Sequence, residues 1–275
     1  MPYLRLAPLM PRIIITGSCG LIGGLVYDAL KELGHEVFGI DRPHSDRISR
    51  GRNIDDKEAL NRLDLALDIS TISVNSLAKI FKGHDQIIHL AADADPSNWG
   101  RSMLEVNIVG THTVLKAAKQ VGIKRIVIAS SGLSQVTLER QLIEGGNLHG
   151  KLIGIEDGVG IDSPYGLSKI VGEELGRAFA SSSMEVISVR IGTVIPDDTE
   201  HVRRGGRLMA TAFLQQDVIN FFIAATHNEL PANQYFLLTA AQSNSPTRFV
   251  DLEPGLSSLG WTPLDWQEWL SVYEG

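Results

Sequence analysis

A tyrosine and a lysine stand four residues apart, at Tyr165 and Lys169. Residues at this spacing share one face of a helix, so the lysine ammonium can lie beside the phenolic hydroxyl. A neighbouring positive charge favours the phenolate, which makes the tyrosine a candidate general base. Ordinary surface pairs have the same spacing, but this pair follows a predicted strand that ends in Ser130 and Ser131. The surroundings therefore favour a catalytic role over a surface pair.

A glycine-rich loop stands near the start of the chain, where Gly17, Gly20 and Gly23 follow a β-branched run at residues 13–15. Glycines between a strand and a helix let the backbone turn tightly and approach a pyrophosphate, which lies on the free N–H groups of the helix. The next predicted strand ends in an acidic residue, Asp41, close to the spacing of about 20 residues typical of ribose recognition. This context favours dinucleotide binding over a purely structural turn.

The residues after the second and third predicted strands bear on which dinucleotide binds. Asp41 can accept hydrogen bonds from both ribose hydroxyls and repels a 2′-phosphate, which favours NAD over NADP. Arg42 is either a solvated surface arginine or a ligand for that phosphate. Asp68 and Ile69 end the third strand, where they either cap the adenine edge or form a plain turn.

The composition limits the class of protein. The chain has 275 residues, a mass of 30.0 kDa and 43% hydrophobic residues, enough for one large domain with a core. Its net charge is −7, and no basic stretch predicts a nucleic-acid partner. No apolar run reaches the roughly 18 residues of a membrane helix. The single cysteine, Cys19, excludes an internal disulfide and a cysteine-rich metal site, so we expect no metal and a reducing, cytoplasmic environment.

Apolar strand patterns alternate with helical patterns, which indicates a parallel sheet covered on both faces. Residues 42–56 are predicted to be irregular, and residues 130–163 to form a loop beside a site. A C-terminal part carries a predicted helix at residues 209–225 and a strand at residues 235–239. The other predicted strands are residues 13–15, 36–41, 63–67, 86–90, 125–129 and 186–191, and the other helices are residues 21–33, 74–81, 103–121 and 164–181.

These motifs resemble the extended short-chain dehydrogenase/reductase superfamily, the NAD-dependent epimerases and dehydratases. The resemblance runs from Ile13 to about Trp266 and rests on the glycine loop, Asp41, residues 89–92, Asn107, Ser130 and Ser131, Tyr165 with Lys169, and residues 189–192. It implies an α/β fold with a Rossmann-like doubly wound parallel sheet. We divide the chain into an extension (residues 1–11), an NAD-binding domain (12–192) and a small substrate-capping part (193–275).

The resemblance also implies residue roles. Tyr165 is the catalytic base, Lys169 orients the nicotinamide ribose and lowers the tyrosine pKa, and Ser131 binds the reacting hydroxyl, with Ser130 as the alternative serine. The implied substrate residues are Ser131, Tyr165, Thr193 and Arg207. The implied cofactor residues are Gly17, Gly20, Leu21, Ile22, Gly23, Asp41, Arg42, Asp68, Ile69, Leu90, Ala91, Ala92, Asn107, Ser130, Tyr165, Lys169 and Ile191.

Two further stretches, residues 189–192 and 207–213, and the tail at residues 259–263 are similar to uronate dehydrogenases and archaeal sugar 1-dehydrogenases. Those enzymes oxidise the anomeric carbon of a sugar or sugar acid to a lactone with NAD. Arg207 matches the position that binds the sugar acid, although a solvated loop arginine is the alternative. Gly132 and Leu133 depart from the Asn-His pair of those relatives, which removes two polar groups from the expected pocket.

Other functions remain open at this stage. A nucleotide-sugar epimerase, dehydratase or reductase uses the same residues, and a sensor binds NAD without turnover. The superfamily implies a homodimer through paired helices. His89 fits a buried core histidine better than a catalytic one, and Asp93 and Asp95 either line the pocket or form a polar loop. Cys19 lies in the glycine loop, where the backbone binds the ligand.

Overall fold

The computed structural model of the protein describes residues 10–42, 57–95, 99–144 and 152–273. Residues 1–9 of the predicted extension and residues 43–56 of the predicted irregular stretch lie outside these ranges. Within the described chain, seven parallel strands form one sheet in the order β3-β2-β1-β4-β5-β6-β7. They are β1 (Arg12–Thr16), β2 (Glu36–Asp41), β3 (Leu65–Ala66), β4 (Gln86–His89), β5 (Arg125–Ser131), β6 (Glu185–Ile191) and β7 (Phe236–Ala241).

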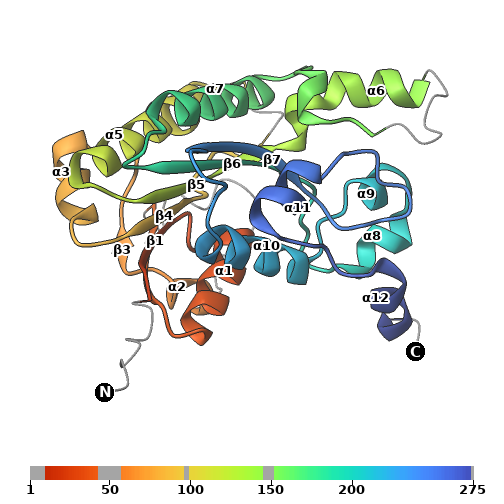
Figure 1. Ribbon diagram of the computed structural model, residues 1–275, viewed down its shortest axis with the longest axis horizontal. Helices are drawn as coiled ribbons and strands as arrows, with labels where there is room; N and C mark the ends of the chain where they lie inside the picture. The colour runs from red at the N-terminus through yellow and green to blue at the C-terminus, as the bar shows by residue number, and fades with distance from the viewer. Residues whose placement is uncertain (1–9, 43–56, 96–98, 145–151, 274–275) are drawn as a thin grey trace.

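Helices cover both faces of the sheet (Figure 1). On one face lie α3 (Val74–Phe81), α5 (Thr111–Val121) and α7 (Pro164–Phe179). On the other face, α1 (Leu21–Glu32) packs against α10 (Gln215–His227). The remaining helices are α2 (Lys57–Leu60), α4 (Ser102–Leu104), α6 (Val136–Glu144), α8 (Thr199–Arg204), α9 (Gly206–Ala210), α11 (Glu253–Leu259) and α12 (Trp266–Tyr273). The predicted doubly wound α/β fold is confirmed. None of the described helices is long and apolar enough to cross a membrane.

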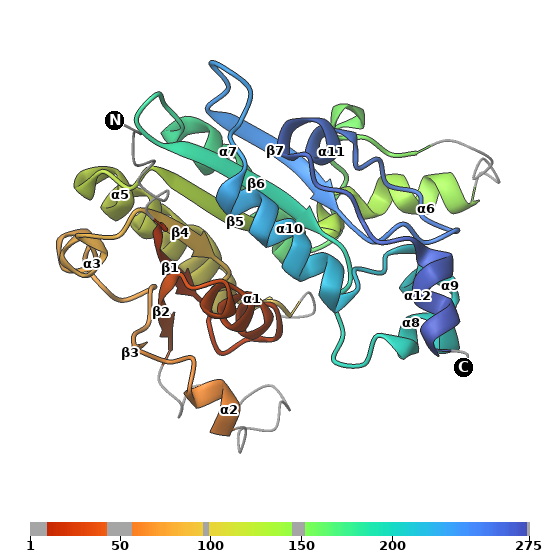
Figure 2. The same ribbon diagram turned by 60° about the horizontal axis from the view of Figure 1, so that its bottom comes forward.

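The order of the strands explains where a ligand can bind. The central strand β1 has three fully buried isoleucines at residues 13–15, as expected for a strand covered on both faces. The chain runs outward in opposite directions from β1 and β4, which leaves a crevice at their carboxyl ends. Figures 1 and 2 place α6, α8, α9 and α12 beyond that same end of the sheet.

Several predicted elements differ from the structure. The helix expected at residues 103–121 is α4, a π-helix η2 (Glu105–Gly110) and α5 in succession. The single helix expected at residues 209–225 is wrong, because α9 and α10 are separated. Between them, Thr193 N–H donates to Thr211 O and Phe213 N–H donates to Thr193 O, which pairs Ala212 with Thr193 in an isolated parallel bridge. The third strand, predicted at residues 63–67, is limited to the two residues of β3.

The expected loop at residues 130–163 contains a helix, α6, between two 3₁₀ turns, η3 (Gly132–Gln135) and η4 (Ile155–Asp157). The C-terminal residues also do more than cap the sheet, since they supply its last strand, β7. Phe213, Phe221 and Trp261 pack edge to face in the core that α10 shares with α1. Residues on both sides of position 193 therefore contribute to one hydrophobic core.

Candidate active site

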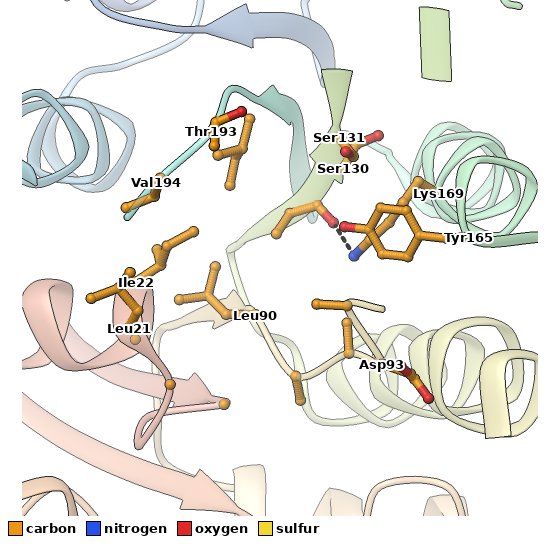
Figure 3. A pocket seen from close by; sticks show the side chains of 18 of the residues that line it. Leu21, Ile22, Leu90, Asp93, Ser130, Ser131, Tyr165, Lys169, Thr193 and Val194 are labelled. Atoms are coloured by element: carbon orange, nitrogen blue, oxygen red, sulfur yellow. Dashed lines mark hydrogen bonds between the residues drawn. The ribbon is translucent and has the colours of Figure 1, made fainter. Parts of the chain in front are cut away.

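A cavity of about 1710 Å³ lies along the carboxyl edge of the sheet. Figure 3 shows Leu21 and Ile22 on one side of it and Tyr165 with Lys169 on the other. With one exception, Asn107, it is lined by every residue that the sequence assigns to the cofactor and the substrate. These are Gly17, Gly20, Leu21, Ile22, Gly23, Asp41, Arg42, Asp68, Ile69, Leu90, Ala91, Ala92, Ser130, Ser131, Tyr165, Lys169, Ile191, Thr193 and Arg207.

The glycine loop has no room for larger residues. Gly17 has a φ of +78°, and a Cβ there would lie 2.7 Å from Ala91 N. A Cβ on Gly23 would lie 2.1 Å from Gly17 O. No side chain caps the start of α1 at Gly20, so the first N–H groups of the helix are left for a ligand. A pyrophosphate fits this cradle, because only backbone N–H groups approach it and the helix dipole favours an anion.

The carboxylates at the ends of β2 and β3 are held in place by backbone N–H groups. Asp41 accepts hydrogen bonds from Cys19 N at 2.9 Å and from Arg42 N at 2.8 Å. Asp68 accepts from the N–H and the hydroxyl of Ser70. Since Asp41 lies beside the loop that would hold a pyrophosphate, its carboxylate is placed to meet the adjoining ribose.

Tyr165, Lys169 and Ser131 meet at the opposite side of the cavity. Ser163 caps α7 by accepting from Gly166 N, which starts the helix so that Tyr165 and Lys169 lie one turn apart. Lys169 Nζ donates to Ala129 O at 2.9 Å and lies 5.5 Å from the centre of the Tyr165 ring (Figure 3). Ser131 lines the cavity beside Tyr165 and lowers the pKa of its hydroxyl. The three groups suit an alcohol substrate whose proton and oxygen must be held.

The electrostatics of these groups are dominated by burial. Burial raises the pKa of the Tyr165 hydroxyl and Asp93 raises it further, while the hydrogen bond from Ser131 acts in the other direction. Burial also lowers the pKa of Lys169 to about 8, although Glu173 opposes the shift. The pKa of Tyr165 is therefore raised, whereas the resemblance implies that Lys169 lowers it.

Ser130 is engaged away from the ligand space. Its hydroxyl donates to Glu173 Oε1 at 2.5 Å, and Glu173 is also held by both nitrogens of the Arg190 fork, at 2.9 and 2.8 Å. Both members of this ion pair are buried. Of the two candidate serines, Ser131 is thus the one that lowers the pKa of the tyrosine, whereas the hydroxyl of Ser130 is bound to Glu173.

Asn107 lies behind the cavity wall. Its side chain exchanges two hydrogen bonds with the backbone of Asp93, at 2.7 and 2.9 Å, and a third with the hydroxyl of Ser168. The π-helix η2 carries Asn107, and such irregular turns often occur at functional sites. Asn107 therefore positions the loop after β4, which lines the cavity through Ala91, Ala92 and Asp93.

His89 is a buried histidine in a hydrogen-bond chain, as its place at the end of β4 predicts. Thr111 donates its hydroxyl proton to Asn107 O, so it must accept from His89 Nε2 at 3.0 Å. His89 Nδ1 then accepts from the hydroxyl of Thr16 at 2.7 Å. Complete burial lowers the pKa of His89 to about 3, which keeps the ring neutral.

Arg207 lines the cavity, but a neighbouring helix supplies a partner for it. Its guanidinium grips Glu139 of α6 through two hydrogen bonds, Nε to Oε1 at 2.5 Å and Nη2 to Oε2 at 2.9 Å. Thr193, the other expected substrate residue of this region, is hydrogen-bonded through its hydroxyl to Thr211 at 2.8 Å. Thr211 in turn donates to Arg207 O.

Comparison with known proteins gives the family of the chain. The sequence pattern of the NAD dependent epimerase/dehydratase family matches residues 13–217. The chain belongs to this family.

Relatives within the family include sugar dehydrogenases. The chain is 29% identical over 272 residues to the L-arabinose 1-dehydrogenase (NAD(P)(+)) of Haloferax volcanii, covering 93% of this chain and 97% of that protein. It is 26% identical to the uronate dehydrogenase of Pseudomonas syringae pv. tomato, over 68% of this chain and 60% of that protein. A solved structure titled mutated uronate dehydrogenase has a TM-score of 0.71 at 25% identity, covering 97% of this chain and 86% of its own.

In this member of the epimerase/dehydratase family, the cavity residues that were not predicted from the sequence include two polar ones, Glu139 and Gln242. Glu139 lies in a region expected to be a loop, and no local pattern marks it. Gln242 follows β7, which extends two residues beyond the predicted strand end at residue 239. Its position at the carboxyl edge of a parallel strand is a signal that a correct strand end would have supplied. The described residues hold no cluster of three or more His, Cys, Asp or Glu that could bind a metal.

Proposed function

We propose that the protein is an NAD-dependent dehydrogenase that oxidises a sugar or sugar acid at the anomeric carbon to a lactone. The observation that carries this proposal is the convergence of Ser131, Tyr165 and Lys169 on a cavity whose other side is the glycine loop. The similarity to L-arabinose 1-dehydrogenase and uronate dehydrogenase supports the anomeric carbon as the reacting centre.

Each residue has a part in handling the substrate. Ser131 and Tyr165 hold the reacting hydroxyl, and Tyr165 accepts its proton as the carbon–hydrogen bond breaks. Lys169 provides a positive charge near the tyrosine ring, which opposes the effect of burial on the phenolate. The glycine loop and the start of α1 would hold the cofactor pyrophosphate, Asp41 the adenosine ribose and Lys169 the nicotinamide ribose. NAD supplies the acceptor for the hydride.

The cofactor preference follows from Asp41. Its carboxylate is fixed by two backbone N–H groups and would repel a 2′-phosphate, so NAD is expected to bind more tightly than NADP. Titration of both reduced cofactors by fluorescence measures the ratio. Equal or tighter binding of NADPH would contradict this and assign Arg42 to the phosphate.

The test of the reaction is a panel of aldoses, uronates and nucleotide sugars, followed by absorbance of reduced nicotinamide and by chromatography of the sugars. Net reduction of NAD with an aldose or uronate supports the dehydrogenase. Redistribution of a nucleotide sugar without net reduction would instead identify an epimerase, a reaction that the family also contains. Tight NAD binding without turnover of any sugar would identify a sensor.

We extend the proposal to assembly and location. Exposed apolar side chains on three helical segments that pack together, Leu104, Val109 and Leu167, suit a homodimer interface. The presence of a single cysteine in the chain, Cys19, and the family's reaction suit the cytoplasm.

A further inference from the structure

The strongest unexplained feature of the cavity is its internal ion pair between Glu139 and Arg207. The Glu139 side chain is only 6% exposed, although it belongs to the short helix α6 at the edge of the molecule. Both of its oxygens are bound by the Arg207 fork, at 2.5 and 2.9 Å. This two-point geometry is the one by which an arginine binds any carboxylate. Glu139 therefore occupies the Nε–Nη2 edge of Arg207 and neutralises its charge.

A chain of contacts places this pair on the Ser131 side of the cavity. Ser131 pairs in register with Ile191 of β6. Two residues later, Thr193 is bonded through its backbone and its hydroxyl to Thr211. Thr211 is bonded to Arg207 O. The pair thus lies beyond the reacting end of the cavity, where the far part of a sugar would rest, and on the opposite side from Asp41.

The other positive side chains at this end are also occupied. Arg190 is bound on two nitrogens by Glu173. Lys169 donates to Ala129 O and is placed at the tyrosine. Asp93 adds negative charge near Tyr165. Among the described residues at this end, an acidic sugar would meet only cations that already have partners, so the loss of its hydration would not be offset, which is costly for a carboxylate.

An uncharged sugar finds a suitable group nearby. Gln242 is 2% exposed and lines the cavity, and its Oε1 has no hydrogen-bond partner among the described residues. Its Nε2 lies 4.0 Å from where a Cβ on Gly132 would stand, next to Ser131. A buried amide oxygen without a partner is unfavourable unless a ligand supplies a donor. A sugar hydroxyl is such a donor.

We propose that Glu139 closes the carboxylate site of Arg207 from within, and that Gln242 receives a hydroxyl, so that the enzyme selects neutral aldoses and rejects uronates. The inference rests on the proposed sugar oxidation and names its substrate class. Glu139 acts as the specificity-determining residue because it fills the place of a substrate carboxylate.

The experiment compares sugars that differ at one carbon, D-galactose with D-galacturonate and D-glucose with D-glucuronate. For each pair we measure kcat/KM with NAD, and also the binding of both sugars by calorimetry to protein saturated with NADH, which prevents turnover. The variants are Glu139→Gln, which frees Arg207, and the double variant Glu139→Gln with Arg207→Gln, which removes both charges. Glu144→Gln, at the exposed end of the same helix, is the matched control.

The wild-type protein should favour the neutral sugar in each pair by about tenfold or more. Glu139→Gln should shift the ratio toward the uronate by about ten- to a hundredfold, the value of a hydrogen-bonded charge contact. The double variant should lose that gain, and Glu144→Gln should match the wild type. Gln242→Met should raise KM for the neutral sugar about three- to tenfold without changing NADH affinity.

Two results would overturn the inference: a wild-type protein that binds uronates as tightly as neutral sugars, or an unchanged ratio in Glu139→Gln. The comparison of neutral sugars with uronates on the wild-type protein tests the inference even if the variant does not fold. If no sugar is oxidised but the binding ratio shifts as described, the inference stands and the proposed oxidation fails. If none of the sugars binds to NADH-saturated protein, both fail.

Discussion

Tyr165 lies in surroundings that disfavour its ionised form. Burial and the nearby Asp93 raise its pKa, and the hydroxyl of Ser131 acts in the opposite direction. Because a phenol that keeps its own proton cannot take up another, Tyr165 can accept the substrate proton only in its ionised form. Ser131 supports the proposed base because it favours that form against the effect of burial.

Replacing this hydroxyl separates catalysis from binding. Tyr165→Phe is expected to lower kcat by about 10²- to 10⁴-fold, the usual loss of a general base, while NAD affinity stays nearly unchanged. Steady-state kinetics and fluorescence titration measure the two quantities. Tyr27→Phe is the matched control, because Tyr27 is a buried tyrosine of α1 whose hydroxyl is bonded to Asp64 outside the cavity. Full activity in Tyr165→Phe would show that the hydroxyl has no catalytic role.

The lowered pKa of Lys169 predicts that the stability of the native protein increases with pH. Its pKa falls from 10.5 in the unfolded chain to about 8 in the native protein, mainly through burial. Between these values the unfolded state binds the extra proton, so native stability rises with pH there. The cost of burying the ammonium is present in full below pH 8 and disappears as the pH approaches 10.5.

Lys169→Met removes this cost at every pH. Relative to the wild type, the variant should gain up to about 3 kcal/mol of unfolding free energy at pH 7, and the gain should shrink between pH 8 and 10. Urea denaturation of both proteins at several pH values measures the difference, in which shared titrations cancel. A gain that grows with pH would contradict the assignment. Activity should be lost in the variant throughout.

The proposed binding of NAD by the glycine loop and α1 depends on the absence of side chains at the loop glycines. Gly23→Ala places a methyl group 2.1 Å from Gly17 O, and backbone cannot yield cheaply. We expect a loss of about 1–3 kcal/mol in stability. We also expect at least about tenfold weaker NAD binding, since about 1.4 kcal/mol of strain in the bound loop costs a factor of ten.

Gly24→Ala is the control for this change. Its new methyl group meets the end of the Arg62 side chain at 2.9 Å, which can move aside. Thermal unfolding and cofactor titration should therefore show a larger loss of stability and of NAD affinity for Gly23→Ala than for Gly24→Ala. Equal cofactor affinity in the two variants would show that the loop tolerates a wider shape than its geometry indicates.

Elements built from local patterns could be predicted, and those set by distant contacts could not. The β-branched run and the glycine loop mark β1 and α1 in the sequence. The parallel order of the strands then determines what surrounds these two elements. The break between α9 and α10 depends on Thr193, which lies 18 residues before its partner Thr211. Glu139 and Arg207 meet across 68 positions. No spacing rule within one element could have brought that pair together.

The whole molecule is organised around one sheet that extends into its C-terminal residues. Asp217 of α10 accepts from Ser243 Oγ at 2.5 Å and from Leu264 N at 2.8 Å, which ties α10 to the segments on either side of α11. The wall that carries Arg207 is thereby fixed to the same core as the glycine loop. The shape of the cavity is therefore determined by this one continuous core.

The outer face of that body carries the last prediction. Leu104, Val109 and Leu167 are exposed, and α7 packs against both α4 and η2, so these apolar side chains lie on neighbouring segments. An apolar surface in water is stabilised by a second copy of the chain. Leu167→Glu would bury a charge in that interface and is expected to yield monomers in light scattering. Leu33→Glu, an equally exposed leucine (46%) at the far end of α1, should leave the assembly unchanged. A wild-type monomer, or a dimer that survives Leu167→Glu, would place the interface elsewhere or exclude it.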